Sequence, residues 1–410
     1  MAILKMKKLR LIAVRSNKEE LLRELIRHGC VEISELEGEL HGTDIEALVH
    51  RESSDVASLK SRHTTLTHAI DLLDHYAPKK GKLLSAKPEL DDRVLLDDTG
   101  LAGALKVAEG IESYDARIKR ISAEESRQRG VIQSLQPWLD LDLPLGTEGT
   151  ERCAVLLGTI PARTELGQVE AALEQIDAES ELFCVHEEKK EHYVVFVCMR
   201  EKLAEMQECL RGFGFSAASF TGVNGTAKES TIEARNTLRS LEREKVDCVQ
   251  YIVDEAVRRD ELKLAADRVS VQISLAEAGD KLYGTDSAVI MEGWYPEERE
   301  AELNEVFERF GCAWEALVPE EDEYPNVPVK LKNNKITNAL NMVTNMYSLP
   351  AYGSLDPNPL MAPFFILFYG LMMADMGYGI IMILAAVIAM KKMKPRAGSL
   401  SFCQLLLYCG

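Results

Sequence analysis

The chain has 410 residues and a formal net charge of −18 at pH 7, and its nine cysteines include no CxxC pair. So large a negative charge, with no basic stripe, argues against a nucleic-acid partner because phosphate would be repelled. The length suggests two to four folding units. The cysteines lie singly, most of them in apolar patterns such as Cys184 in ELFCVHE, so we expect reduced core thiols in a cytoplasmic protein.

The first 36 residues predict a strand, a helix and a second strand. Asn17 is placed to cap a helix over Lys18–His28, and Gly29 is placed to end it. Residues 9–14 are too short an apolar run for a signal peptide, so we expect this part in the cytoplasm. A single βαβ unit of this size cannot bury its sheet, and it needs a partner from elsewhere in the chain.

Residues 44–138 have a mostly helical pattern, with a turn between helices predicted at residues 78–88. Residues 151–220 then contain a strand, a helix, a two-stranded hairpin, a second helix and a last strand. The two helices are expected at residues 164–176 and 202–213. This β-α-β-β-α-β order is that of the ferredoxin-like unit.

Residues 227–280 show the pattern of one uninterrupted helix, which would be roughly 80 Å long at 1.5 Å per residue. A 3-4 spacing gives twelve seam positions, nine of them apolar, as in a coiled coil. The apolar positions are Leu238, Leu241, Cys248, Ile252, Leu262, Ala266, Val269, Ile273 and Ala276, and the polar ones are Lys245, Glu255 and Arg259. The expected partner is the helical part of residues 44–138, running in the opposite direction.

Residues 287–318 repeat the strand, helix and strand pattern, and with residues 8–36 they predict a second, split lobe. The predicted fold is an α+β dumbbell, in which two ferredoxin-like α/β lobes are joined by a long antiparallel helical rod and followed by a transmembrane helical segment. The predicted domains are 1–43 with 283–325 (proximal lobe), 44–150 with 221–282 (coiled-coil-like rod), 151–220 (distal ferredoxin-like lobe), 326–362 (linker and amphipathic helix), 363–390 (membrane segment) and 391–410 (loop and start of a truncated second membrane helix).

Residues 330–347 predict a short amphipathic helix, because Ile336, Leu340, Val343 and Tyr347 keep a helical spacing. Two interpretations are open. The helix lies against the membrane surface or another subunit, or it packs within the protein like an ordinary helix.

Residues 360–390 are almost wholly apolar and contain no Lys or Arg, so this run is predicted to enter a membrane. Asp375 interrupts it among Gly370, Gly377 and Gly379, which predict a break. Two roles for Asp375 are open. It is a proton-path or inter-helix polar contact, or a structural carboxylate bonded to backbone groups that are freed at the break.

Two topologies are also open for this run. One tilted helix over residues 364–390 would reach roughly 40 Å and cross the membrane. A break at Asp375 would instead give a hairpin with legs of about 16–22 Å, which needs neighbouring helices as a shield. The basic flank at Lys391, Lys392, Lys394 and Arg396 prefers the cytoplasm, like the large amino-terminal part, and so favours the hairpin slightly.

No Walker A, GxGxxG, HExxH or GxSxG motif occurs in the sequence. We therefore predict no catalytic residue, no cofactor site and no metal site. His63, His68 and His75 are spaced five and seven residues apart, which on an exposed helix points to a solvated face.

The segments PNVPVKLKNN, MYSLPAYGSLDPNPLMAPFFILFYG and ADMGYG together resemble the membrane stator subunit of V/A-type rotary ATPases, called subunit a or subunit I. At the last site the family usually has Gly-Asp-x-Gly-His/Tyr-Gly, whereas here Ala374 replaces the first Gly and Tyr378 fills the aromatic position. The sequences KMKKLRLIAV and EGWYPEE are also similar to the family, so that the resemblance extends along the whole chain.

The resemblance implies a non-catalytic stator subunit of a proton- or sodium-translocating complex, with a cytoplasmic dumbbell and a multi-pass membrane domain. Its partners would be the peripheral-stalk subunits and other ATPase subunits. The half-channels and an essential arginine facing the rotor ring belong to later helices that this sequence does not contain. An alternative, from fold analogy alone, is a membrane-tethered sensor whose ferredoxin-like lobes bind a small ligand.

Overall fold

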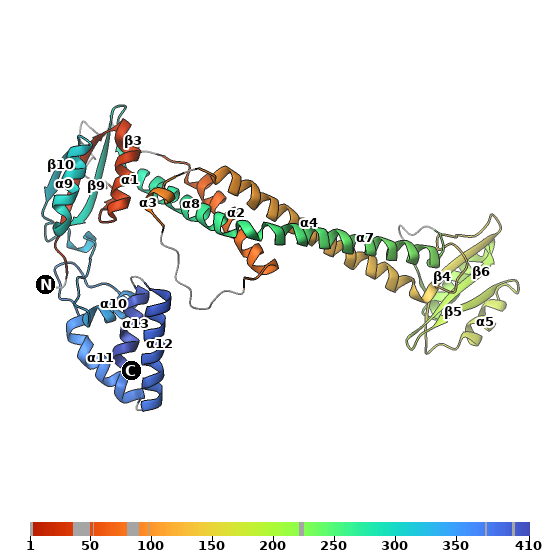
Figure 1. The fold of residues 1–410 in the computed structure, drawn as a ribbon. Helices are drawn as coiled ribbons and strands as arrows, with labels where there is room; N and C mark the ends of the chain where they lie inside the picture. Colours follow the sequence, from red (N-terminus) through yellow and green to blue (C-terminus); the bar gives the residue numbers. More distant parts are fainter. Residues whose placement is uncertain are drawn as a thin grey trace. The chain divides into compact units, whose positions relative to one another are not determined.

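The structure is a computed structural model that describes residues 3–35, 50–51, 53–79, 90–97, 99–220, 225–373, 375–395 and 398–410. It is a mixed α/β chain with long helices and two antiparallel sheets, as predicted (Figure 1). The chain divides into two compact units, one of Met1–Glu109 with Ala256–Gly410 and one of Gly110–Glu255. Most of the turn predicted at residues 78–88 lies outside the described residues.

The sheet of the first unit joins strands from residues 6–51 with strands from residues 283–317. Its order is β10-β1-β9-β8-β3, and β2 also pairs with β9. The longest ladder is antiparallel and runs from Met6↔Pro296 to Val14↔Ala288. The strands are β1 (Met6–Val14), β2 (Glu32–Ser34), β3 (His50–Arg51), β8 (Tyr283–Gly284), β9 (Ala288–Pro296) and β10 (Ala313–Leu317).

Two helices, α1 (Lys18–His28) and α9 (Glu300–Arg309), supply apolar residues to the core of this sheet. Gly29 ends α1 in the left-handed conformation, with φ of 58°, as predicted. Asn17 is the N-cap residue of α1, as predicted, but its side chain makes no capping hydrogen bond. Its side chain donates a hydrogen bond to the carbonyl oxygen of Phe310 at 3.3 Å, because a 3-10 turn at Arg15–Asn17 leads into the helix instead.

In the first unit, α2 (Val56–Tyr76) packs antiparallel to α8 (Arg259–Gly279), beside the short α3 (Asp92–Leu95). Helix α4 (Leu101–Leu135) begins in the first unit, and from Gly110 it lies in the second unit beside α7 (Ala227–Asp254). The predicted single helix over residues 227–280 is wrong, because a 3-10 segment at Glu255–Arg258 separates α7 from α8. Two of the three polar seam positions, Glu255 and Arg259, coincide with this interruption, where the apolar seam is missing.

The nine apolar seam residues are all buried or half-buried. Two of the polar seam residues, Lys245 and Arg259, interact with polar groups of other helices. Lys245 lies 3.0 Å from the carboxylate of Glu125, whose side chain is 6% exposed. Arg259 is fully buried and donates hydrogen bonds to the carbonyl oxygens of Leu73 at 2.8 Å and Ala77 at 2.5 Å. The carbonyl oxygen of Leu73 already accepts the backbone N–H of Ala77 at 2.9 Å, so Arg259 adds a second hydrogen bond there and caps the end of α2 at Ala77.

The sheet of the second unit has the order β5-β6-β4-β7 with antiparallel neighbours, which is the strand order of the ferredoxin-like unit. Helices α5 and α6 cover one face, and Leu135, Trp138 and Ala227 pack on the other. The elements are β4 (Cys153–Pro161), α5 (Leu166–Glu174), β5 (Glu181–Glu187), β6 (Glu191–Met199), α6 (Leu203–Gly212) and β7 (Ser216–Ala217).

The cysteines divide into buried, half-buried and exposed positions. Cys198, Cys248, Cys312 and Cys403 are buried, as expected of core thiols. Cys184 is exposed, and its predicted place in the core is wrong. It lies on β5, which is an edge strand of its sheet and buries little of either face.

Beyond the first sheet, residues 330–347 are helical only from a 3-10 turn at Thr337–Leu340 into α10 (Asn341–Tyr347). The prediction of one amphipathic helix over residues 330–347 is therefore wrong. Before this turn, the backbone N–H of Leu4 donates a hydrogen bond to the carbonyl oxygen of Lys330 at 2.9 Å, and Leu331 forms a β-bridge with Ile3. Leu340 is fully buried against the apolar helices, whereas Tyr347 is 87% exposed.

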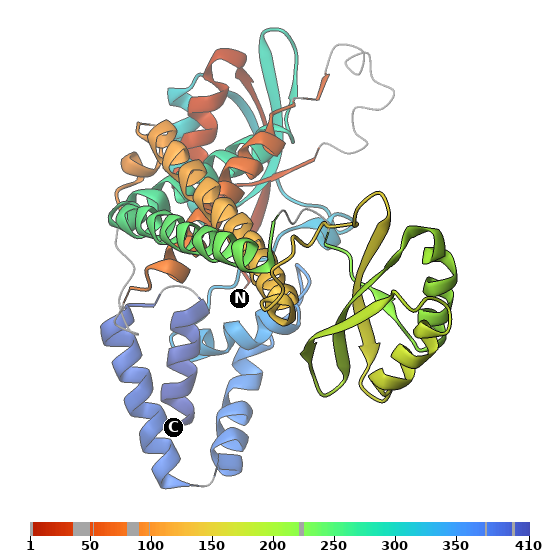
Figure 2. The same ribbon diagram turned by 90° about the vertical axis from the view of Figure 1, so that its right-hand side faces the viewer.

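The apolar run forms two helices, α11 (Asn358–Met373) and α12 (Met376–Met393), so a single helix over residues 364–390 is wrong. Figure 2 shows them running in opposite directions, with α13 (Gly398–Cys409) between them and in contact with both. By length and composition, α12 is the one helix of the described residues that could span a membrane.

Replacing Arg259 tests the buried cap at the end of α2. Arg259→Leu is expected to lower the free energy of unfolding by about 3 kcal/mol, because hydrogen bonds from a charged donor are worth about 1.5–3 kcal/mol each. Urea unfolding of the detergent-solubilised chain, followed by tryptophan fluorescence, measures the change. The matched control is Arg258→Leu, which removes an exposed ion pair with Glu261 and should cost about 0.5 kcal/mol or less. Equal losses in both variants would contradict the capping role.

Candidate functional site

The break at Asp375 separates two apolar helices. Asp375 has an extended backbone conformation, and its carboxylate accepts hydrogen bonds from the backbone N–H groups of Gly377 at 2.7 Å and Tyr378 at 3.4 Å. It is the N-cap of α12, so it pairs donors that the first turn of a helix leaves free. This geometry matches the structural one of the two predicted roles.

The glycines around the break differ in what they do. A Cβ at Gly377 would lie 3.1 Å from the capping oxygen of Asp375, and one at Gly379 would lie 2.9 Å from the carbonyl oxygen of Gly410. Gly379 thus permits a close approach of α12 and α13. Gly370 lies within α11 with open space around it, and it is not part of the break. Ala374 and Arg396 lie outside the described residues.

A network of asparagine side chains holds the start of α11. Asn358 is fully buried, donates to the amide oxygen of Asn341 at 2.7 Å and accepts a hydrogen bond from the hydroxyl of Thr344. Asn341 also donates to Asn338 at 2.8 Å, and Asn338 lies 3.4 Å from the hydroxyl of Ser401 on α13. Buried polar groups that are satisfied in this way fix one arrangement of the elements they join.

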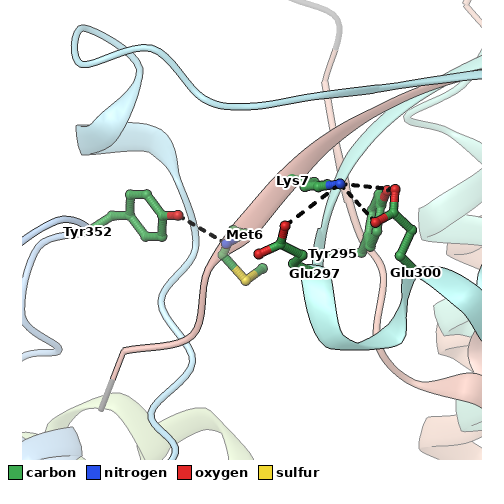
Figure 3. Close-up of polar contacts among 6 residues, drawn as sticks. All are labelled: Met6, Lys7, Tyr295, Glu297, Glu300 and Tyr352. Carbon is green, nitrogen blue, oxygen red and sulfur yellow. Dashed lines mark hydrogen bonds and ion pairs between the residues drawn. The ribbon is translucent and has the colours of Figure 1, made fainter. Parts of the chain in front are cut away.

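The first strand of the chain is joined to the segment that precedes these helices. Figure 3 shows the hydroxyl of Tyr352 directed at the backbone N–H of Met6, which donates to it at 3.0 Å. The ring of Tyr352 packs edge-on against Tyr324, with centroids 5.2 Å apart. Met6, Trp294 and Val327 form a small apolar cluster on which Tyr352 also packs.

Charged residues lie beside this junction. Lys7 forms an ion pair with Glu300 at 2.8 Å and approaches Glu297 at 3.9 Å (Figure 3). Burial, with the nearby charge of Glu300, raises the pKa of Tyr295 to about 12, so its hydroxyl stays a donor and lies 3.4 Å from the Glu300 carboxylate. The pairs lock the start of α9 against the end of β9.

Lys8 carries a second, buried set of ion pairs. Its ammonium group is 3.0 Å from Glu292 and 2.8 Å from Glu323, and it lies 5.9 Å from the ring centre of Trp294. The hydrogen bond from Lys8 lowers the pKa of Glu323 below its ordinary value. Since Glu323 follows β10, the pair ties the residues after the sheet to its first strand.

Sequence reasoning located Asp375 but missed the asparagine network and the Tyr352 contact. One signal for the network was present, because Asn338 and Asn341 stand one helical turn apart and so share a helix face. The partner of Tyr352 could not be found, since Met6 is 346 residues away in the sequence.

Residues 168–401 match the model of the V-type ATPase 116kDa subunit family, and this is more than half of the chain. The chain belongs to this family. It is 25% identical over 409 residues to A-type ATP synthase subunit I of Methanocaldococcus jannaschii. The aligned region covers 95% of this chain and 59% of the relative. It is 24% identical over 419 residues to A-type ATP synthase subunit I of Thermococcus kodakarensis, which covers 98% of this chain and 62% of the relative. The family member described here thus spans about three fifths of the length of these relatives.

The family member also resembles the crystal structure of the cytoplasmic N-terminal domain of subunit I, a homolog of subunit a, of V-ATPase. The match has a TM-score of 0.42 and 16% identity, and it covers 76% of this chain and 99% of that one. The family resemblance inferred from the sequence is confirmed by the family match.

Two substitutions at Asp375 separate its two predicted roles. Asp375→Asn is expected to keep the stability of the chain, because the amide oxygen accepts the same two hydrogen bonds. Asp375→Ala is expected to lower it by about 1 kcal/mol, the usual cost of losing an N-cap. Thermal unfolding in detergent measures both. A loss of stability in Asp375→Asn as large as that in Asp375→Ala would contradict a purely capping role.

The ion pair between Lys8 and Glu323 predicts a dependence of stability on pH. Because the folded-state pKa of Glu323 is lowered, its contribution is present above the ordinary glutamate pKa of about 4.3 and is lost as the pH falls through the lower folded value. Wild type should therefore melt at a higher temperature than Glu323→Gln at pH 7, and the difference should shrink below about pH 4. A difference that is independent of pH would refute the assignment.

Proposed function

We propose that this chain is the stator part of the membrane subunit of an ion-translocating rotary ATPase, and that it has no catalytic site of its own. The proposal rests on family membership and on the name subunit I that its relatives carry. The observation that carries it is the direct attachment of the first sheet to the segment leading into the apolar helices, at Met6 and Tyr352.

A stator must resist torque, and this attachment supplies a stiff path for the load. Force on the apolar helices would pass through the asparagine network to the linker and then to β1. Lys332 adds an ion pair to Glu298 at 2.6 Å on the same linker. Since β1 pairs along its length with β9 and also with β10, load on its first residues is spread over the central ladders of the sheet.

We propose the dumbbell arrangement for the cytoplasmic part, with one α/β lobe at each end of the antiparallel helices. The helices support this by length alone, since the 35 residues of α4 reach about 52 Å. Peripheral-stalk subunits would bind at the two lobes, and the rotor ring is a further proposed partner of the subunit. The sensor alternative gains nothing from the relatives, which carry the name of an ATP synthase subunit.

Helices α11 and α12 form the apolar hairpin. The proposed topology places the start of α11 and the end of α12 on the cytoplasmic side. Helix α11 has 16 residues and α12 has 18, so they reach about 24 Å and 27 Å, longer than the legs expected from the sequence. Their opposite directions bring the start of α11 and the end of α12 to the same side (Figure 2), and the last turn of α12 contains Lys391 and Lys392. That side would be the cytoplasm, because positive flanks prefer it.

A deletion tests the two-lobe stator. Replacing residues 151–220 by a short turn should leave the first unit folded and the chain in the membrane, because the deleted lobe has its own core. In a pull-down with purified peripheral-stalk subunits, we expect one of two stalk contacts to be lost.

The control exchanges charges on the rod, where Arg117 and Glu244 pair at 2.6 Å. The double variant Arg117→Glu with Glu244→Arg keeps the pair and should bind both stalks. Undiminished stalk binding by the deletion would show that the distal lobe is not an anchor. Absence of this chain from the purified ATPase complex would refute the proposed function itself.

A further inference from the structure

Three side chains with metal-binding atoms meet on the hairpin of β5 and β6, far in sequence from the membrane-proximal residues. Among the described residues, Cys184, Glu187 and His192 form the one group whose ligand atoms all lie within 4.8 Å of one another. The sulfur of Cys184 is 3.9 Å from a carboxylate oxygen of Glu187, and Nδ1 of His192 is 3.9 Å from the same oxygen. Family membership assigns no role to this cluster, and the sequence predicted no metal site.

An irregularity in the strand creates the cluster. In a regular strand, residues three apart face opposite sides of the sheet. The register between β5 and β6 shifts between Cys184 and His186, so that Cys184 pairs with Val194 while Glu187 pairs with His192. A bulge re-aims side chains in this way. It brings Cys184 and Glu187 to the same face as His192, which a regular strand would not do.

The cluster also contains an unsatisfied donor or acceptor. Nδ1 of His192 is inaccessible to solvent and has no hydrogen-bond partner, although 16% of the side chain is exposed. A buried polar atom without a partner costs free energy. A divalent cation would pair all three groups, and the thiol would release its proton on binding.

We propose that Cys184, Glu187 and His192 bind one Zn²⁺ ion, with water in the fourth position. A set of one sulfur, one nitrogen and one oxygen ligand suits zinc, whereas Ca²⁺ and Mg²⁺ take oxygen ligands. Tetrahedral bonds of about 2.0–2.3 Å require ligand atoms about 3.5 Å apart. Cys184 and Glu187 are both exposed and can close the remaining distance by changing rotamer.

The ion would cross-link the edge strand β5 to its neighbour β6 near the turn that joins them. Edge strands otherwise expose unpaired backbone groups and are free to shift. The bound metal would therefore fix the register of this hairpin, and with it the outer edge of the distal lobe. This role does not depend on the proposed stator function.

Metal titration of the whole chain, solubilised in detergent with a non-thiol reductant, tests the site. We expect one Zn²⁺ per chain by calorimetry, and Co²⁺ as a substitute should give a sulfur-to-cobalt charge-transfer absorption. Cys184→Ser and His192→Ala should each weaken Zn²⁺ binding by at least about tenfold. Cys184→Ser should also abolish the charge-transfer band.

Matched controls lie on the same hairpin. His186→Ala and Glu188→Ala remove an exposed histidine and an exposed carboxylate outside the cluster, and both should bind Zn²⁺ like wild type. Circular dichroism and the melting temperature without metal check that each variant is folded. If Cys184→Ser or His192→Ala fails to fold, Glu187→Gln, at an exposed position, supplies the same comparison. Absence of saturable binding by wild type, or equal losses in cluster and control variants, would overturn the proposal.

Discussion

The pairing of β1 with β9 is the constraint on which the rest of the chain depends. The first strand contributes nine residues to a ladder whose other strand begins at Ala288, so the chain must leave the sheet after β3 and return to it at β8. Antiparallel helices are the economical way to do so, since each satisfies its own backbone hydrogen bonds. The α2–α8 and α4–α7 pairs, and the second sheet between α4 and α7 in the sequence, are consequences of that return path. The same first strand then holds the segment before the apolar helices through Met6.

Local patterns predicted most elements of the fold, because the signals for them are local. Gly29 ended a helix where a glycine in the left-handed conformation was expected, and the alternation in β4 and β6 gave those strands. The failures were side chains whose partners are distant. Asn17 bonds to Phe310, and Arg259 reaches the end of α2, so neither does what its neighbours in the sequence suggest. A helix was predicted over residues 330–347, but it begins only at Thr337, and Lys330 instead accepts a backbone hydrogen bond from Leu4.

The candidate sites divide in the same way. Asp375 could be found from the sequence because one carboxylate in an apolar run is conspicuous, and its partners, Gly377 and Tyr378, are its neighbours. The cluster at Cys184 could not be predicted from the sequence. It depends on a register shift between β5 and β6, for which the sequence of β5 contains no signal. The thiol was expected in the core since ELFCVHE reads as a buried strand, whereas β5 lies at the edge of its sheet.

The split first sheet also determines the order in which the protein is assembled at the ribosome. About 270 residues separate the end of β1 from the start of β9, which at 5–20 residues per second is roughly 15–55 s of synthesis. The distal lobe is contiguous and can fold within that time, so the strand that is made first finds its partner last. Helix α11 begins only 41 residues after β10 ends, at Asn358. The strands of the first sheet are therefore complete only shortly before the first apolar helix is synthesised.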